Sequence, residues 1–213
     1  MTVKRQLPLP RNQGCRKALE IWKSCRIRRH SSLDAARPVT FAGIVRAYRR
    51  DYEQSTQAEF DYYANLPSIK DAVARASRAE RPDGKRHDHQ TRIRDDALRQ
   101  VARRLENASW SSFKSFSDVH TFLEKNIGPI SGIGELMVYD TALRVGARLG
   151  FEPKVVYLHR GTRSGLRALG LNANRPFVEV SELPEELRSL RPHQLEDCLC
   201  IYKTELGLIA AKV

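Results

Sequence analysis

Apolar residues dominate positions 135–149 in a pattern that belongs to a buried helix. After the first residue, the only polar side chains are those of Asp140, Thr141, Arg144 and Arg148. At 100° per residue these four positions fall on one narrow stripe, so we expect the rest of the helix surface to pack against other elements. The pattern therefore predicts a helix at the centre of the fold.

Helical spacing of apolar residues recurs along most of the chain, and strand-like alternation is rare. Further helices are expected within residues 18–22, 41–52, 57–65, 68–79, 90–105, 117–127, 160–170, 181–190 and 192–206, with short extended runs at 155–158 and 177–180. We therefore expect a mainly α fold, a helical bundle with at most one or two short strands. Residues 1–37 are expected to form a basic N-terminal arm with a short helix, and residues 38–213 a single α-helical domain.

A glycine-rich corner stands ahead of the central helix. Gly132-Ile133-Gly134 follows a shorter helix, for which Ser117-Asp118 is the expected N-cap. Glycines permit a sharp reversal and a close approach of backbone to a ligand. The helix that starts behind them leaves unpaired N–H groups, and the positive end of its dipole faces outward. Residues 117–149 therefore predict a phosphate-binding unit, and nucleic acid is the expected ligand.

ISGIG followed by an apolar helix resembles the helix-hairpin-helix motif. Residues from about 89 to 171 are also similar in layout to the helix-hairpin-helix DNA glycosylases: a helix containing Gln90, a Trp- and Phe-rich connection, the hairpin, and an extended run into another helix. The resemblance implies a DNA-binding protein of DNA repair. It would hold the phosphate backbone of duplex DNA through the backbone of Gly132, Ile133 and Gly134.

The catalytic residues of that family are not matched. Bifunctional members carry a lysine just after the second hairpin glycine, where this chain has Glu135 and Leu136, so the Schiff-base route is not expected. The family's catalytic aspartate, usually in Asp-x-His, is also missing, since no aspartate lies between Asp140 and Asp197. His159 matches the family's histidine.

An enzyme would therefore need a replacement acid, and the candidates are Asp140, Glu135 and Glu152, with His159 beside them. A carboxylate in an apolar surround can be tuned for acid or anion chemistry. The alternative for Asp140 is an i,i+4 ion pair with Arg144 on the helix face. The alternative for Glu135 is a first-turn position favoured by the helix dipole, and for Glu152 a loop.

Arg160, Arg163 and Arg167 share one face of the helix that follows the extended run, at i, i+3 and i+7. Thr162 and Ser164 lie among them, and their hydroxyl groups can donate to phosphate oxygens. Gly161 and Gly165 of the same helix allow another helix to pack close to it. We expect this face to bind phosphate beside the hairpin; the alternative is an ordinary solvated surface.

Net charge is +12, and the first 50 residues carry 13 Lys and Arg against two acidic residues. Arg26, Arg28 and Arg29 are the densest part of this excess. An arm of this kind neutralises phosphates and makes affinity depend on salt. The alternative is a basic tail without a defined partner. Trp22 is expected to pack on the domain.

No metal or other cofactor is expected. The cysteine pairs Cys15/Cys25 and Cys198/Cys200 lack the two-residue gap of a zinc knuckle, and His87 and His89 form an H-x-H in a polar loop without a second defined ligand pair. The aromatic residues of positions 48–63 are either core or the wall of a nucleobase pocket.

The sequence thus favours a DNA-binding protein with a glycosylase-like scaffold. Two alternatives stay open: an active monofunctional base-excision glycosylase with a non-standard carboxylate, and a protein-interaction module. No apolar run approaches 18 residues and the N-terminus lacks a signal-like apolar segment, so no membrane association is expected and the cytoplasm is the expected location.

Overall fold

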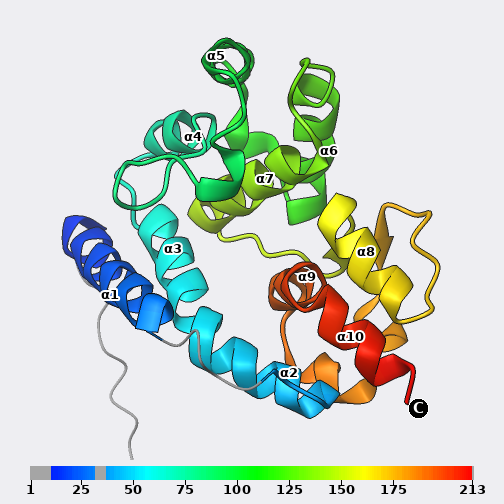
Figure 1. Cartoon of the computed structure of the whole chain (residues 1–213). Coiled ribbons are helices and arrows are strands. Elements are labelled where there is room, and N and C mark those ends of the chain that lie inside the picture. The colour runs from blue at the N-terminus through cyan, green and yellow to red at the C-terminus, as the bar shows by residue number, and fades with distance from the viewer. Residues whose placement is uncertain (1–10, 32–36, 213) are drawn as a thin grey trace, which may run out of the picture.

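Helix α7 (Glu135–Leu149) runs through the first of two hydrophobic cores. The structure is a computed structural model that describes residues 11–31 and 37–212, with side chains described for 13–25 and 37–212. α7 packs against α3 (Gln54–Ala64), α4 (Ile69–Ala76) and α6 (Phe116–Ile127), while α5 (Asp95–Leu105) lies at the outer edge (Figure 1). Together with α1 (Arg11–Ser31), these helices form what we call the first lobe.

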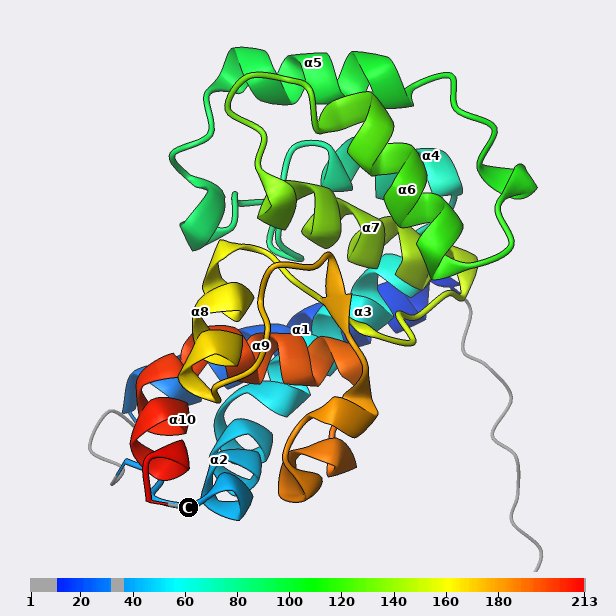
Figure 2. The same cartoon turned by 90° about the vertical axis from the view of Figure 1, so that its right-hand side faces the viewer.

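The second core belongs to the C-terminal third of the chain and to α2 (Phe41–Tyr48). It contains α8 (Arg160–Ala168), α9 (Pro192–Ile201), α10 (Lys203–Ala210), and the strands β1 (Val156–Tyr157) and β2 (Phe177–Val178). The strands pair antiparallel with Val156 opposite Val178. Figure 2 shows this second lobe beneath α6 and α7, with α8 and α9 nearest to the first lobe.

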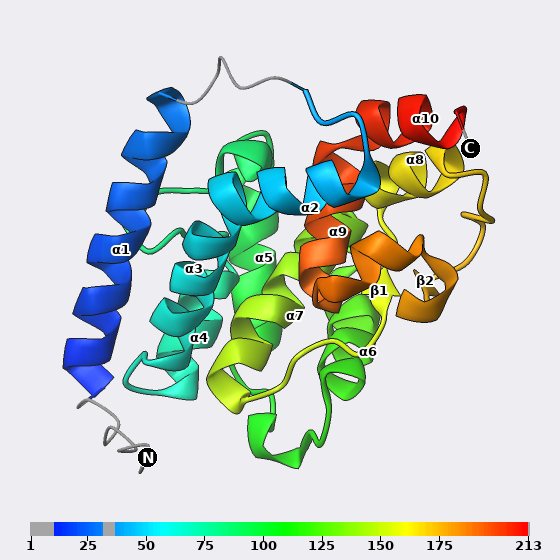
Figure 3. The same cartoon turned by 90° about the horizontal axis from the view of Figure 1, so that it is seen from below.

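One bent helical run joins the two lobes. It begins with α2, passes through a π-helical turn at Arg49–Glu53, and continues as α3. The Thr40 side chain caps its start by accepting from the Gly43 N–H. Viewed from below, the run crosses from the second lobe to the first, where α1 packs along α3 (Figure 3). π-turns within α-helices are frequent at functional sites, and Tyr52 of this turn lines the cavity described below.

The mainly α fold expected from the sequence is confirmed, and the short extended runs form the two-stranded sheet β1–β2. Ser68 caps α4 as expected, in a reciprocal capping box with Asp71. In the described part of the chain, no helix combines the length and the apolar character needed to cross a membrane.

Four helix predictions are wrong. The helix expected at 90–105 begins only at Asp95, and Gln90 lies in a separate 3₁₀ turn, Asp88–Gln90. The N-cap of α6 is Ser115, not Ser117-Asp118, and Asp118 instead accepts from the backbone N–H of Lys114. Residues 181–190 do not form one helix: two 3₁₀ turns, Val180–Glu182 and Glu185–Ser189, flank Pro184, which has no N–H to donate to a continuous helix. The helix expected at 192–206 breaks at Tyr202 into α9 and α10.

Helix α1 is longer than the short helix expected in the N-terminal arm. It spans 21 residues and packs against α3. Trp22 is buried, as predicted, with the guanidinium of Arg81 over its ring at 5.4 Å. The side chains of Arg26, Arg28 and Arg29 lie outside the described residues, so their predicted phosphate contacts are not addressed.

The contact between α8 and α9 depends on Gly165. A Cβ at this position would lie far inside van der Waals contact with the carbonyl group of Leu199. We expect Gly165→Ala to lower the free energy of unfolding by about 1–3 kcal/mol, the usual cost of overpacking, measured by urea denaturation. Gly207→Ala is the matched control, because its Cβ would meet the Ala168 Cβ at an ordinary 3.5 Å. Equal stability of the two variants would contradict this packing.

Candidate functional site

The turn between α6 and α7 buries its isoleucines and exposes its glycines. Ile127, Ile130 and Ile133 are buried in the first core, whereas Gly132 and Gly134 are exposed. The Ile133 N–H donates to the Ile130 carbonyl oxygen at 3.0 Å. Gly132 has a φ of +88°, a conformation that a side chain would strain. We call residues 128–134 the hairpin.

The hairpin presents unpaired backbone donors to the outside. Among the described residues, the N–H groups of Gly132, Gly134 and Glu135 have no hydrogen-bond acceptor, since the first bonds of α7 run from Met137 and Val138 to the Gly134 carbonyl oxygen. A Cβ built on Gly134 would meet nothing within 4 Å, so the space in front of this backbone is open. Open N–H groups at a helix N-terminus are suited to an anion.

Arg163 of α8 lies beside the hairpin but is engaged within the protein. Its guanidinium pairs with the Glu135 carboxylate at 2.8 Å and donates to the carbonyl oxygens of Ala173 and Arg175. The expectation that Arg163 is free to contact phosphate is therefore wrong in this structure. The pair also neutralises Glu135, whose exposed position at the hairpin would otherwise repel an anion.

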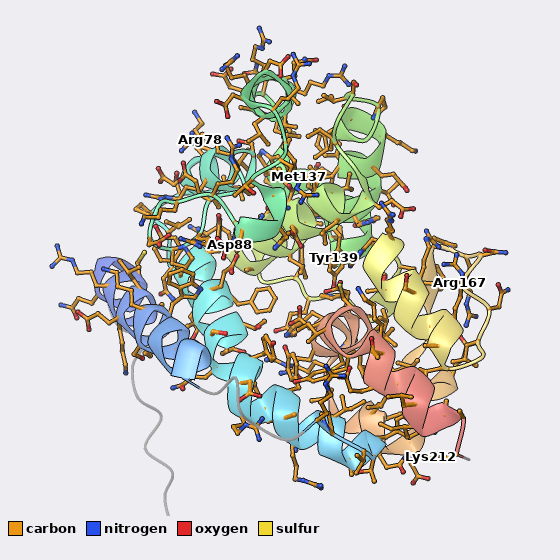
Figure 4. All side chains as sticks on the ribbon, viewed as in Figure 1. Arg78, Asp88, Met137, Tyr139, Arg167 and Lys212 are labelled. Atoms are coloured by element: carbon orange, nitrogen blue, oxygen red, sulfur yellow. The ribbon has the colours of Figure 1, made fainter. Side chains whose placement is uncertain are left out.

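Thr162 contradicts its prediction as well. It is fully buried, and its hydroxyl donates to the His159 carbonyl oxygen and accepts from the His159 N–H, which caps α8. Phosphate cannot reach it. Arg160, Ser164 and Arg167 of the same helix are exposed, although the Ser164 hydroxyl donates to the Arg160 carbonyl oxygen at 3.1 Å. Figure 4 places Arg167 on the outer side of α8.

A cavity of about 760 Å³ opens between the two lobes, and we call it the interlobe cleft. Residues of α3, α7 and α9 line it, together with the 87–89 segment and Trp22. Of the aromatic residues at positions 48–63, Tyr48, Tyr62 and Tyr63 are buried in the cores, while Tyr52 and Phe60 line the cleft. Ionisable side chains from each of these three helices line the cleft.

Asp140 projects from α7 into the cleft within a network of donors. Its Oδ2 accepts from Gln90 Nε2 at 2.7 Å, lies 2.9 Å from His89 Nε2, and is 3.7 Å from Arg144. Burial alone would raise the pKa of Asp140, but the hydrogen bond from His89 and the charge of Arg144 outweigh it and lower that pKa. Asp140 is therefore ionised at neutral pH.

Arg144 is itself buried, and it joins Asp140 to α3. Its Nε donates to Glu59 Oε1 at 3.1 Å, and His87 Nε2 lies 2.9 Å from the same oxygen. Burial opposes ionisation of Glu59, but the contacts to His87 and Arg144 lower its pKa to about 2. The polar stripe of α7 thus faces α3 and the 87–90 segment.

Two adjacent carboxyl groups of α9 form the opposite wall. Glu196 binds the His159 ring Nε2, and Asp197 accepts from the Tyr48 hydroxyl at 2.7 Å. Burial, together with the charge of Glu196, raises the pKa of Asp197 to about 8. Burial also raises the pKa of Glu196. The hydrogen bond and charge of Glu196 outweigh the burial of His159 and raise the pKa of that ring.

The cleft therefore contains carboxyl groups in opposite protonation states. Asp140 on α7 is ionised, while Asp197 on α9 keeps its proton near pH 7. Groups whose environments move their pKa values apart are typical of acid and base partners in catalysis. Structural ion-pair networks also shift pKa values, so this arrangement identifies a candidate site and no reaction.

The structure brings two of the predicted catalytic residues, Asp140 and His159, to the cleft and leaves the other acids outside it. Glu135 is 57% exposed and pairs with Arg163, and Glu152 is 62% exposed and pairs with Arg191. The sequence reasoning missed four residues of the cleft: Glu59, His193, Glu196 and Asp197. The acidic pair inside the apolar stretch LEDCLCIY was the signal available for two of them.

A metal centre has no support in the geometry. Among the described residues, no group of three or more His, Cys, Asp or Glu side chains is arranged to hold a metal ion. The rings of His87 and His89 lie 5.4 Å apart and turn to different carboxylates, Glu59 and Asp140. The cysteines described in the structure are free thiols.

No protein-family description matches this chain, and neither a curated protein nor a solved structure matches it. The resemblance of residues 89–171 to the helix-hairpin-helix glycosylases therefore stays a prediction from the sequence.

His193 of the cleft should make stability fall in acid. Its ring is 2% exposed, packs edge-on against Phe60 at 4.6 Å, and has no hydrogen-bond partner among the described residues. Burial lowers its pKa to about 3. Because this is below the ordinary histidine value of about 6.5, the unfolded chain binds the proton first, and stability is lost as pH falls from about 6.5 towards 3.

We expect His193→Phe to reduce the acid slope of the unfolding free energy by about 1.4 kcal/mol per pH unit, the value for one proton. Urea denaturation of both proteins between pH 6.5 and 4.5 measures it. Parallel pH profiles would show that His193 is not held neutral in the cleft.

Proposed function

We propose that this protein binds DNA through the phosphate backbone, with a helix-hairpin-helix architecture similar to that of the DNA glycosylases and a role in DNA repair. The observation that carries the proposal is the set of unpaired N–H groups of Gly132, Gly134 and Glu135 in front of α7. Their dipoles add to the positive end of a 15-residue helix. A phosphate oxygen is the acceptor that this backbone lacks.

Exposed cations on the same side of the molecule support this proposal. In Figure 2 the hairpin and α8 lie on the same side, and α8 exposes Arg160 and Arg167. The basic excess of the first 50 residues adds attraction for a polyanion. We place this activity in the cytoplasm as part of the proposal, which free thiols at all four cysteines support.

The interlobe cleft favours a second candidate, a monofunctional DNA N-glycosylase for a damaged or modified base. An enzyme of this class extrudes the base from the duplex into a pocket. Asp140, ionised, would stabilise positive charge on the sugar while the C1′–N bond breaks, and would accept a proton from the water that adds to C1′. Asp197, protonated, would donate a proton to the departing base. Glu135 drops out as a replacement acid because it is paired outside the cleft.

Gly134→Val tests phosphate binding. Gly134 has an extended backbone (φ −102°, ψ 174°) and open space in front of it, so valine fits the fold but covers the N–H groups. We expect duplex affinity to fall by about tenfold or more and the slope of log affinity against log salt to lose about one phosphate contact. Fluorescence anisotropy at several salt concentrations measures both, with the melting temperature as a check of folding.

Gly207→Ala, on α10, is the control and should leave DNA affinity unchanged. A folded Gly134→Val protein with wild-type affinity would rule out the hairpin as the phosphate site. Binding of the wild type that stays level from low to high salt would instead favour a protein-interaction module.

Asp140→Asn tests the second candidate. On any duplex whose lesion base the wild type removes, we expect the excision rate to fall at least about 100-fold while DNA affinity changes less than threefold. Time courses on duplexes with a panel of lesion bases, followed by hot alkali, measure excision. Glu152→Gln, which removes an exposed carboxylate outside the cleft, is the control. No strand scission by the wild type with any lesion would remove the enzyme candidate for that panel.

A further inference from the structure

We infer that a second cavity, beside the hairpin, binds one nucleobase of the strand whose phosphate the hairpin N–H groups hold. This inference rests on the proposed DNA binding and adds a base-recognition site to it. The cavity measures about 520 Å³, within the roughly 300–1,000 Å³ range of small-molecule pockets. We call it the hairpin cavity.

The hairpin cavity adjoins the backbone that is proposed to bind phosphate. Ile133, Gly134 and Glu135 form one of its walls, and α6 and β1 form others. A phosphate at the Gly134 and Glu135 N–H groups would therefore stand at its edge, with the attached sugar and base within reach of its interior. Arg163 also lines the cavity and neutralises Glu135 there.

Rings line the interior of the hairpin cavity. His120 of α6 and Tyr157 of β1 lie with their centroids 4.3 Å apart, and the ring of Tyr139 is 5.8 Å from that of Tyr157. Burial lowers the pKa of His120, so its ring is uncharged at neutral pH. Flat uncharged rings bind nucleobases by stacking, as in single-strand-binding proteins.

Tyr139 supplies an independent sign of a missing ligand. It lines the hairpin cavity, is 1% exposed, and its hydroxyl has no hydrogen-bond partner in the described part of the chain. Leaving a buried hydroxyl unsatisfied destabilises a protein, and such groups are rare. A heterocycle with ring nitrogens and exocyclic oxygens can provide the partner, whereas a purely apolar ligand cannot.

The hairpin cavity is separate from the interlobe cleft. His159 contributes to both, but the acids Asp140, Glu196 and Asp197 line only the cleft. The two acids of the hairpin cavity are Glu135, which pairs with Arg163, and Glu124, which is exposed to solvent on α6. Its base would therefore be held and left intact.

The test compares a single-stranded thymidine decamer with a decamer of the same backbone in which every sugar is abasic. We expect the wild type to bind the thymidine strand about 5- to 100-fold more tightly, the range for one stacked base. Tyr139→Phe should lower affinity for the thymidine strand at least threefold, leave the abasic strand unaffected, and raise the melting temperature. A purely structural Tyr139 would give the rise in melting temperature without the loss of binding.

Tyr63→Phe is the matched control. Tyr63 is equally buried, but its hydroxyl donates to the Glu80 carbonyl oxygen at 2.6 Å, so its removal should lower the melting temperature and leave the affinities for both strands unchanged. If the wild type bound both decamers with equal affinity, and Gly134→Val lowered both affinities, the base site would be overturned. The phosphate site would still stand. Failure of both decamers to bind at low salt, while the duplex still binds, would overturn this inference alone. Failure of the decamers and of the duplex would overturn the DNA-binding proposal with it.

Discussion

The unpaired N–H groups at the start of α7 are the constraint on which this account depends. Every helix leaves its first N–H groups without intrahelical acceptors, and a side-chain cap or water usually takes them. Here the residue before the helix is Gly134, which has no side chain to act as a cap. The first N–H groups of α7 therefore have no side-chain cap and remain exposed to an external acceptor.

The rigidity of α7 comes from both of its faces. Its apolar face fills the first core, with Met137, Val138, Ala142 and Val145 buried. Its polar stripe is held by the buried guanidinium of Arg144, which pairs with Glu59 and Asp140. Removing one partner of such a buried pair costs about 3–5 kcal/mol, so this network fixes the helix against α3. The same network lines the interlobe cleft, which links the position of the hairpin to the geometry of the candidate catalytic groups.

Local sequence was sufficient for the elements whose signals lie within one turn of helix or one reversal. The apolar face of α7 and the glycine corner both depend on residues that are close together in the sequence. Both could therefore be predicted from the sequence alone. Local patterns also predicted Ser117-Asp118 as the N-cap of α6, whereas the N-cap is Ser115. Several serines lie near the start of this helix, and each could act as the cap. Residues 181–190 were predicted to form one helix because their acidic and apolar residues have regular helical spacing. Pro184 nevertheless separates them into two 3₁₀ turns.

The cleft could not be predicted in the same way, because its members meet only when the two lobes come together. Glu59, Asp140 and Asp197 are up to 138 positions apart along the chain, and their pKa shifts arise from burial between helices. Thr162 shows the opposite case: its hydroxyl suits phosphate chemically, but the fold uses it to cap α8. Arg163 is likewise taken by Glu135 and by two carbonyl groups of the 173–175 segment.

A ¹H–¹⁵N NMR titration of the full chain with a short DNA duplex tests the central claim most directly, because it observes the backbone N–H groups themselves. The account predicts that the N–H resonances of Gly132, Gly134 and Glu135 shift most, and that these shifts diminish as salt is raised. Unmoved hairpin resonances in a protein that binds the duplex through other residues would contradict it.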